Sequence, residues 1–433
     1  MNYIILLYLL SISAGALDMT SNIKGQKVSN NYRSNHIVFN TIDHKRYSES
    51  YTFINHTMDS IHNSNGLSPF YQKLFDLKAG RTRRVNIVQI GDSHIQPDLI
   101  SREIRTGLQD FFGDAGRGLV FPYQVARTNG PLDISSSTST RWSYNKISQL
   151  RAKSAIGLAG FSLSKLNGAG NIKLSLKSDI NAREQSFDYI RLFVGKGAWN
   201  VNTLGKDLGS YTIDQSASEI LLKQPATGFN LHSLASNSNF FGASLEKRNT
   251  SGVLFHTIGV NGAMYEQYNK EPLFWEQLPA LNADLYILSM GTNEAFNNGM
   301  TEELYIHHVS GMIAKLQTIS PNAAILITTT AESFKNGRTN PMIERLNLAL
   351  KFYSNKMGIP VWDLFEITGG SGSSMAWLKN NLLQADKIHY QQKAYSMQGA
   401  LLFDAIAQGY NEFVGSKQQQ MNIPSLETRT ASK

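Results

Sequence analysis

Continuous runs of Val, Ile, Leu and Phe recur along this 433-residue chain, and most of them lead through a polar turn into an amphipathic segment. Runs without alternation are typical of strands that are buried on both faces of a parallel sheet. The segments between them place apolar residues at helical spacing, as at Ile100, Ile104 and Leu108. The pattern predicts helices packed on both faces of a mainly parallel sheet. The expected strands are 85–90, 253–259, 283–291, 323–330 and 359–365, and the expected helices are 67–77, 97–112, 302–319, 342–356 and 392–408.

A stretch with a different pattern interrupts this alternation. Between about 140 and 250 the chain shows short runs of period two, among them FSLSKL, NIKLSLKS and FDYIRLFVG, separated by Gly, Asn and Asp. Such runs predict a β-sandwich that is inserted within the α/β domain. The expected organisation is an α/β domain in two parts around an inserted sandwich, with a polar lead-in and a polar tail: 17–65, 66–139, 140–250, 251–410 and 411–433 in chain order.

The N-terminus carries an apolar stretch, MNYIILLYLLSISAGALD. An apolar core that runs into Ala14-Gly15-Ala16 is typical of a secretory signal peptide. Residues 1–16 are therefore expected to be a signal peptide, and the mature protein is expected to be periplasmic or secreted. The alternative is a buried N-terminal strand or helix, since no Lys or Arg precedes the apolar core. No later apolar run approaches the roughly 20 residues of a membrane span, so no integral span is expected.

The composition excludes several kinds of site. The chain has no cysteine, which excludes disulfides, thiolate metal sites and a cysteine nucleophile. The net charge of +8 favours acidic surfaces in general. However, the basic residues are scattered and no nucleic-acid or phosphate-binding motif is present, so nucleic acid is not an expected partner. His307 and His308 are adjacent and point about 100° apart on a helix, which suits a shared metal poorly; no metal or other cofactor is expected.

Four polar clusters follow expected strands or precede the last expected helix: 91–94, 259–262, 291–294 and 386–389. In open parallel sheets ligands bind beyond the carboxyl ends of the strands, so these clusters are expected to meet at one site. Ester cleavage by a serine requires a nucleophile, a histidine base, a carboxylate that orients the base, and donors for the oxyanion. The four clusters together contain every one of these groups.

In these clusters the sequence resembles the SGNH (GDSL-type) hydrolases. Gly-Asp-Ser at 91–93 matches the nucleophile block, and Gly262 in GVNGA matches the glycine block. Gly-x-Asn at 291–293 matches the block with an oxyanion asparagine, and Asp-x-x-His at 386–389 matches the last block. Gly259 is the alternative for the glycine block. The resemblance implies a three-layer α/β/α, flavodoxin-like hydrolase domain with a mainly parallel sheet, interrupted here by the β-sandwich.

The resemblance also implies a role for each matching residue. Ser93 is expected to be the nucleophile, His389 its base, and Asp386 the carboxylate that orients the imidazole. The oxyanion is expected to be bound by the backbone N–H groups of Ser93 and Gly262 and by the side-chain amide of Asn293. Each side chain has a structural alternative: Ser93 and Asn293 as turn residues, Asp386 as a helix cap, and His389 as a surface histidine.

The stretch IGDSHIQPD has His94 where the family usually has Leu. With the long β-rich insert, it is similar to bacterial peptidoglycan O-acetylesterases, whose insert resembles a carbohydrate-binding module. This similarity implies a serine carbohydrate esterase that removes O-acetyl groups from a cell-wall polysaccharide, such as peptidoglycan, through an acyl-enzyme. The alternatives are an O-acetyltransferase with the same triad and a polysaccharide-binding protein with an inactive esterase domain.

Other polar and aromatic residues are assigned supporting roles. Within the insert, Trp199, Tyr211 and Asn200 are expected to be exposed and to contact sugars; the alternative is that they pack inward and the insert is a brace. Four polar residues beside the nucleophile are expected to pack around it rather than to react: Asp92, His94, Gln96 and Asp98.

Overall fold

The computed structural model describes residues 41–42, 51–152, 154–177, 185–195, 198–204, 210–213 and 217–422. The predicted signal peptide and most of the predicted lead-in therefore lie outside the described residues. The α-helices are α1 (Ser68–Lys78), α2 (Leu99–Phe112), α3 (Tyr265–Asn269), α4 (Pro272–Gln277), α5 (Thr292–Phe296), α6 (Glu302–Ile319), α7 (Pro341–Met357), α8 (Leu364–Ile367), α9 (Ser373–Lys379) and α10 (Gln392–Asn422). Short 3₁₀ helices lie at His56–Met58, Ser64–Leu67 and Leu278–Leu281.

The strands fall into one largely parallel sheet, a pair of antiparallel sheets and a small hairpin. Those of the parallel sheet are β1 (Ile61–His62), β2 (Arg84–Gly91), β14 (Gly252–Gly259), β15 (Leu285–Ser289), β16 (Ala324–Thr328) and β19 (Val361–Trp362), and those of the hairpin are β17 (Phe334–Lys335) and β18 (Arg338–Thr339). The antiparallel sheets contain β3 (Gly116–Val120), β4 (Ile134–Ser137), β5 (Ser143–Lys146), β6 (Phe161–Lys165), β7 (Gly170–Leu176), β8 (Phe187–Val194), β9 (Trp199–Leu204), β10 (Ser210–Ile213), β11 (Ala217–Ala226), β12 (Gly228–Ser233) and β13 (Ser238–Glu246).

The parallel sheet has the order β1-β19-β16-β15-β2-β14, in which only the edge strand β1 is antiparallel to its neighbour. Strand β2 therefore lies between β14 and β15, which are the next two strands of this sheet in chain order after the inserted sandwich. This arrangement creates a topological switch point at the carboxyl end of β2, the position at which open α/β sheets bind ligands. The predicted flavodoxin-like parallel sheet is confirmed.

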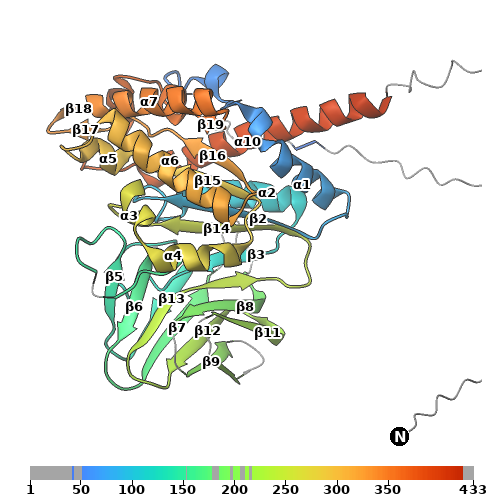
Figure 1. Ribbon diagram of the computed structural model, residues 1–433, viewed down its shortest axis with the longest axis vertical. Helices are drawn as coiled ribbons and strands as arrows, with labels where there is room; N and C mark the ends of the chain where they lie inside the picture. Colours follow the sequence, from blue (N-terminus) through green and yellow to red (C-terminus); the bar gives the residue numbers. More distant parts are fainter. Residues whose placement is uncertain are drawn as a thin grey trace, which may run out of the picture. The chain divides into compact units, whose positions relative to one another are not determined.

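Two groups of helices cover the parallel sheet. Helices α1, α2 and α10 pack against one another, and α6 packs against both α3 and α7 in a second group (Figure 1). Successive side chains of a strand point to opposite faces of a sheet, so buried strands must supply apolar residues to both layers. Val85, Ile87, Val88 and Ile90 of β2 are all fully buried. These layers form the predicted α/β/α arrangement.

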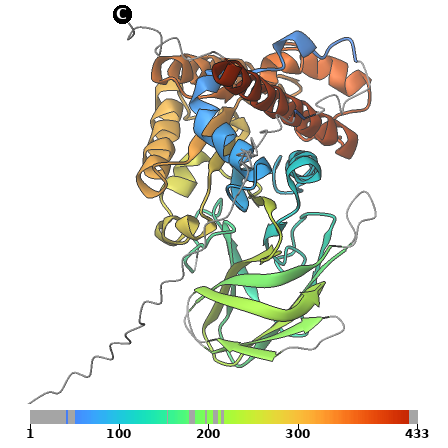
Figure 2. The same cartoon turned by 90° about the vertical axis from the view of Figure 1, so that its right-hand side faces the viewer.

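The antiparallel strands form a sandwich, drawn mainly in green in Figure 2. One sheet has the order β10-β9-β12-β7-β4, and the other has the order β11-β8-β13-β6-β5 with β3 also paired to β13. Strand β9 alternates buried and partly exposed residues, with Trp199 and Val201 pointing inward. This alternation is the period-two pattern that the sequence predicted, with one face of the sheet in the core and the other facing outward.

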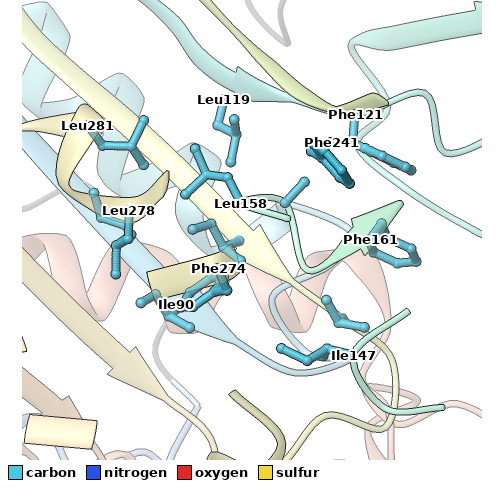
Figure 3. Packing of buried hydrophobic residues seen from close by; sticks show 14 of the residues in the cluster. Ile90, Leu119, Phe121, Ile147, Leu158, Phe161, Phe241, Phe274, Leu278 and Leu281 are labelled. Carbon is cyan, nitrogen blue, oxygen red and sulfur yellow. The ribbon is translucent and has the colours of Figure 1, made fainter. Parts of the chain in front are cut away.

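The sandwich and the α/β domain share a hydrophobic core. Ile90 of β2 and Phe274 of α4 belong to the same buried cluster as Leu158, Phe161 and Phe241 of the sandwich (Figure 3). Strand β3 pairs with β13 of the sandwich and also contacts β14 of the parallel sheet. The insert is thus built into the α/β domain through a continuous apolar interface.

Three boundaries differ from those expected. The predicted lead-in contains β1, which pairs with β19 at the edge of the parallel sheet. The sandwich sheets include β3 and β4, which precede the expected boundary at 140. The last helix continues to Asn422, beyond the expected end at 408, because Tyr410 and Val414 remain buried at helical spacing. The part of the predicted tail up to 422 is therefore helical.

Candidate active site

The four polar clusters meet at the carboxyl edge of the parallel sheet. Ser93 follows β2, Gly262 follows β14, and Asn293 lies in the first turn of α5 directly after β15. Asp386 and His389 lie in the loop that precedes α10. The structure therefore gathers all five predicted site residues from segments that are far apart in the chain.

Ser93, His389 and Asp386 form a continuous chain of hydrogen bonds. The Oγ of Ser93 lies 2.8 Å from Nε2 of His389, and Nδ1 of His389 lies 2.7 Å from Oδ2 of Asp386. These are the contacts that a histidine base and its orienting carboxylate require. Since Oδ2 faces Nδ1, the favoured tautomer carries its proton on Nδ1 and leaves the Nε2 lone pair for the serine hydroxyl.

The backbone holds Asp386 in this orientation. Its second oxygen, Oδ1, accepts hydrogen bonds from the amides of Ile388 and His389 at 2.9 and 3.0 Å. Lys387 adopts a left-handed conformation with φ of 60°, which folds the Asp-x-x-His segment tightly enough for these contacts. Partial burial opposes ionisation of Asp386, but the hydrogen bonds from His389 and the two amides outweigh it and lower the pKa of this carboxyl. Asp386 is thus held as a carboxylate.

Asn293 and the loop after β14 lie beside each other. The side-chain Nδ2 of Asn293 donates to the carbonyl oxygen of Ala263 at 2.9 Å, and it lies 3.4 Å from Oδ2 of Asp92. Gly262, the residue before Ala263, has φ of +82°, a conformation that L side chains rarely adopt. This arrangement places the Asn293 amide beside residues 260–264, the loop between β14 and α3 that carries Gly262 (the glycine loop). Both lie at the carboxyl edge of the sheet, where Ser93 follows β2, as an oxyanion site requires.

Asp92 and His94 flank the nucleophile; Asp92 is buried and His94 is partly buried. Oδ1 of Asp92 accepts from the His94 backbone amide at 2.9 Å, and burial raises the pKa of Asp92 to about 7. The His94 Nδ1 lies 2.9 Å from the Tyr395 hydroxyl, and its ring centroid lies 5.2 Å from that of His389. Burial, and then the charge of His389, lowers the pKa of His94 to about 3. His94 is therefore neutral and packs against the catalytic imidazole.

Gln96 and Asp98 connect residues 92–98, the loop between β2 and α2 that carries Ser93 (the nucleophile loop), to its surroundings. Oε1 of Gln96 accepts from the backbone amide of Asn261 at 2.6 Å, which joins this loop to the glycine loop. Asp98 is held by two arginines, with Arg105 Nη2 at 2.7 Å and Arg117 Nη2 at 2.6 Å from its Oδ2. Both Gln96 and Asp98 are buried. Neither contacts the reacting hydroxyl, so their contacts are those of packing residues.

Two acidic residues near the site were not singled out from the sequence. Glu294 is fully buried, its Oε1 accepts from the Tyr265 amide at 2.8 Å, and burial raises its pKa to about 8. Glu332 accepts from the amides of Gly372 and Ser374 at the start of α9. The only sequence signal for Glu294 is its place after Gly-Thr-Asn, and Glu332 has none.

The described residues contain no group of three or more His, Cys, Asp or Glu arranged to hold a metal ion. In the same part of the chain, no helix combines the length and apolar character that a bilayer crossing needs.

The chain is similar to known acylhydrolases in part of its sequence and in its fold. Residues 224–396 match the model of the GDSL-like Lipase/Acylhydrolase family, a range that includes Asn293 and His389 but not Ser93. A solved structure described as a peptidoglycan O-acetylesterase in action superposes with a TM-score of 0.67 at 22% identity, over 84% of this chain and 98% of the other. The chain therefore has the fold of the SGNH hydrolases.

Other solved structures match a smaller part of this chain. A lipase/acylhydrolase from Enterococcus faecalis shares 21% identity over 36% of this chain and 77% of its own, with a TM-score of 0.29. A GDSL-like lipase from Bacteroides thetaiotaomicron shares 17% identity over 37% of this chain and 76% of its own, with a TM-score of 0.29. No curated protein matches the sequence. The partial match to the acylhydrolase family and the assembled Ser93, His389 and Asp386 are both features that a serine esterase would have.

Proposed function

We propose that this SGNH hydrolase removes O-acetyl groups from peptidoglycan by way of an acetyl-enzyme. The observation that carries the proposal is the 2.8 Å contact between Ser93 Oγ and His389 Nε2, backed by the 2.7 Å contact to Asp386. Ser93 Oγ attacks the acetyl carbonyl carbon while His389 takes its proton. The bond between that carbon and the sugar oxygen then breaks, and His389 returns the proton to the departing sugar alkoxide.

The second half of the reaction reverses these roles with water. His389 takes a proton from a water molecule, the resulting hydroxide attacks the acetyl carbon, and acetate leaves as Ser93 Oγ regains its proton. In both halves the negative charge on the carbonyl oxygen is bound by the amides of Ser93 and Gly262 and by Asn293. One such donor contributes about 3–4 kcal/mol to transition-state stabilisation.

The proposed substrate rests on the extent of the structural match. The structure described as a peptidoglycan O-acetylesterase aligns over almost its entire length, with a coverage of 98%. Export fits this substrate, because peptidoglycan lies outside the cytoplasmic membrane. We therefore also propose that residues 1–16 are a signal peptide and that the mature enzyme is periplasmic or secreted.

The sandwich offers a surface for the polymer, although not the one expected. Trp199 is fully buried and packs 6.5 Å from Trp142, so its predicted contact with sugars is wrong. Tyr211 is partly buried against the hydrophobic core. Asn200, in contrast, lines an open groove on the sheet that contains β9. Its other lining residues are Ser139, Thr140, Ala169, Gly170, Asn171, Asn202, His232, Ser233 and Leu234.

The register of the strands places three of these side chains in one row across the sheet. Asn200 of β9 lies opposite His232 of β12, and His232 lies opposite Asn171 of β7. Amide and imidazole groups in such a row can donate hydrogen bonds to, and accept them from, the hydroxyl and amide groups of a glycan chain. We propose that this groove holds the polysaccharide. Asn202→Ala should then raise the KM for polymeric substrate and leave the kinetics on an aryl acetate unchanged; equal losses on both substrates would contradict a binding role.

Substrate and outcome are tested in one experiment. Acetate release is measured from O-acetylated peptidoglycan and from acetylated xylan, each with and without an added sugar acceptor. The proposal predicts faster release from peptidoglycan and no acetylated acceptor. Preferential cleavage of xylan would refute the substrate, acetyl transfer to the acceptor would identify an acetyltransferase, and no release from either would leave the polysaccharide-binding alternative.

A further inference from the structure

A short segment of the insert reaches the glycine loop of the catalytic domain. Lys146 is the last residue of β5, and Ile147 and Ser148 follow it. Ile147 is buried in the core shared by the two domains, where Figure 3 shows it near the end of a strand. Its amide donates to the carbonyl of Gly160 at 2.9 Å. Ile147 thus anchors the segment, and Lys146 and Ser148 flank this anchor.

Both flanking side chains bind the same atom. Ser148 Oγ donates to the carbonyl oxygen of Asn261 at 2.7 Å, and Lys146 Nζ donates to it at 3.1 Å. Lys146 and Ser148 are partly buried, and burial lowers the pKa of Lys146. The Asn261 carbonyl oxygen therefore accepts one hydrogen bond from a hydroxyl and one from a lysine side chain, both in the inserted domain.

That carbonyl belongs to the peptide group that carries the Gly262 amide. A peptide unit is planar and trans, so its C=O and N–H bonds point in opposite directions. Fixing the direction of the Asn261 carbonyl therefore fixes the direction of the Gly262 N–H. On the other side of Asn261, its own amide is held by Gln96 Oε1 at 2.6 Å. Within the described part of the chain, the Gly262 N–H donates to no protein acceptor.

We propose that Lys146 and Ser148 are positioning residues of the inserted domain that aim the Gly262 N–H at the oxyanion. This inference rests on the proposed function, because it presupposes that Gly262 is an oxyanion donor. Two donors on the carbonyl also polarise the peptide group and strengthen its N–H as a donor. The insert then contributes to the rate of ester cleavage itself, in addition to any contact with the polymer.

The magnitude follows from the cost of losing a donor. Complete removal of one oxyanion donor lowers kcat by about 10²–10³-fold. Misdirecting the donor is milder, so Ser148→Ala and Lys146→Met should each lower kcat about 10-fold, on the basis of that range. Because the two side chains act on one atom, their effects in the double variant should not be independent.

The experiment uses the full chain and a small aryl acetate, which is too short to involve a polymer groove. Ser148→Thr and Lys146→Arg keep a donor and should retain kcat near that of the wild type. Lys165→Met is the matched control, because Lys165 lies on the neighbouring strand β6 and donates to the carbonyl of Asn167. A trifluoromethyl ketone, which forms an oxyanion when a serine adds to it, gives a second readout independent of turnover.

The expected result is a lower kcat with an unchanged KM in Ser148→Ala and Lys146→Met, and ketone binding weakened by the same factor as kcat/KM. A higher KM with unchanged kcat would overturn the inference, since the side chains would then bind substrate. The inference would also be overturned if kcat and ketone affinity in Ser148→Ala and Lys146→Met equalled those of Lys165→Met. Ser93→Ala distinguishes failure of the proposed function from failure of this inference. If Ser93→Ala retains esterase activity, the proposed function is refuted. If Ser93→Ala loses activity while Ser148→Ala and Lys146→Met keep the wild-type kcat, only this inference is refuted.

Discussion

A buried ion network joins the nucleophile loop to the sandwich, and Arg117→Met is the change that breaks it. Arg117 of β3 contacts Asp98, which precedes α2, and Asp133, which precedes β4. The side chains of Arg117 and Asp98 are each only 2% exposed. Arg105 binds the same Asp98 carboxylate, and Thr257 of β14 donates to it at 2.7 Å. The network therefore connects α2, the parallel sheet and the start of the sandwich.

The magnitude follows from the burial of these charges. Removing one partner of a buried ion pair leaves an uncompensated charge and costs about 3–5 kcal/mol. Of the two carboxylates, Asp133 loses more when Arg117 is replaced, because Arg117 supplies its two shortest ionic contacts. Arg117→Met should therefore lower the free energy of unfolding by about 3–5 kcal/mol. An ion pair on the surface serves as the control. Arg81 binds Asp76 and its side chain is 51% exposed, so Arg81→Met should lower the free energy of unfolding by at most about 1 kcal/mol.

The assay is urea unfolding of the two variants and the wild type at neutral and acidic pH. Burial opposes ionisation of Asp98, but the charges of Arg105 and Arg117 outweigh it and keep its pKa below the usual value. The pKa of Asp133 is lowered in the same way by Arg117. A carboxyl with a lowered folded-state pKa stabilises the fold above its unfolded pKa of about 4, and this contribution is lost as the pH falls through the folded value. A loss below about 1 kcal/mol at neutral pH, or an Arg117→Met effect equal to that of Arg81→Met, would show that the buried ion network does not stabilise the fold.

Three further outcomes are expected. Asp386→Asn should lower kcat by about 10²–10³-fold, less than the roughly 10⁴-fold loss for a buried triad aspartate, because the Asp386 side chain is 45% exposed. Steady-state kinetics on an aryl acetate measure this loss. A loss below about 10-fold would contradict the role of Asp386 in orienting His389. Since burial raises the pKa of Asp92 to about 7 and that of Glu294 to about 8, the folded state binds protons more tightly than the unfolded state, and the free energy of unfolding should fall as the pH rises from about 5 to 8. Glu294→Gln should flatten this slope in urea titrations, and an unchanged slope would contradict the assignment. Dialysis against a chelator should leave esterase activity unchanged, and a loss that zinc restores would overturn the serine mechanism.

The α/β domain could be predicted because its strands have a simple signal. Segments such as 85–90 and 253–259 are mostly apolar and do not alternate strictly between apolar and polar residues, which is typical of a strand covered on both faces. The site residues could be found for a related reason, since each follows such a strand or precedes the last helix. Their convergence at one edge is a consequence of parallel strands in one sheet.

Features that depend on tertiary contacts were not predicted. Trp199 alternates with Asn200 and Asn202 in WNVN, and alternation alone does not tell which face of a sandwich strand is inside. The end of α10 reads as polar because GSKQQQ follows Val414, and its helical course depends on the burial of Tyr410 and Val414. Lys146 and Ser148 precede Asn261 by more than a hundred residues, so their contact with its carbonyl has no local signature.

The most direct test of the account is the rate of acetate release from O-acetylated peptidoglycan by the wild type and by Ser93→Ala. A serine at the end of β2 contributes little to the core, so the variant should fold and unfold like the wild type. If Ser93 is the nucleophile, the rate should fall about 10³-fold or more, with the residual rate coming from substrate binding and the oxyanion donors. Retention of a tenth of the wild-type rate by folded Ser93→Ala would contradict this role of Ser93.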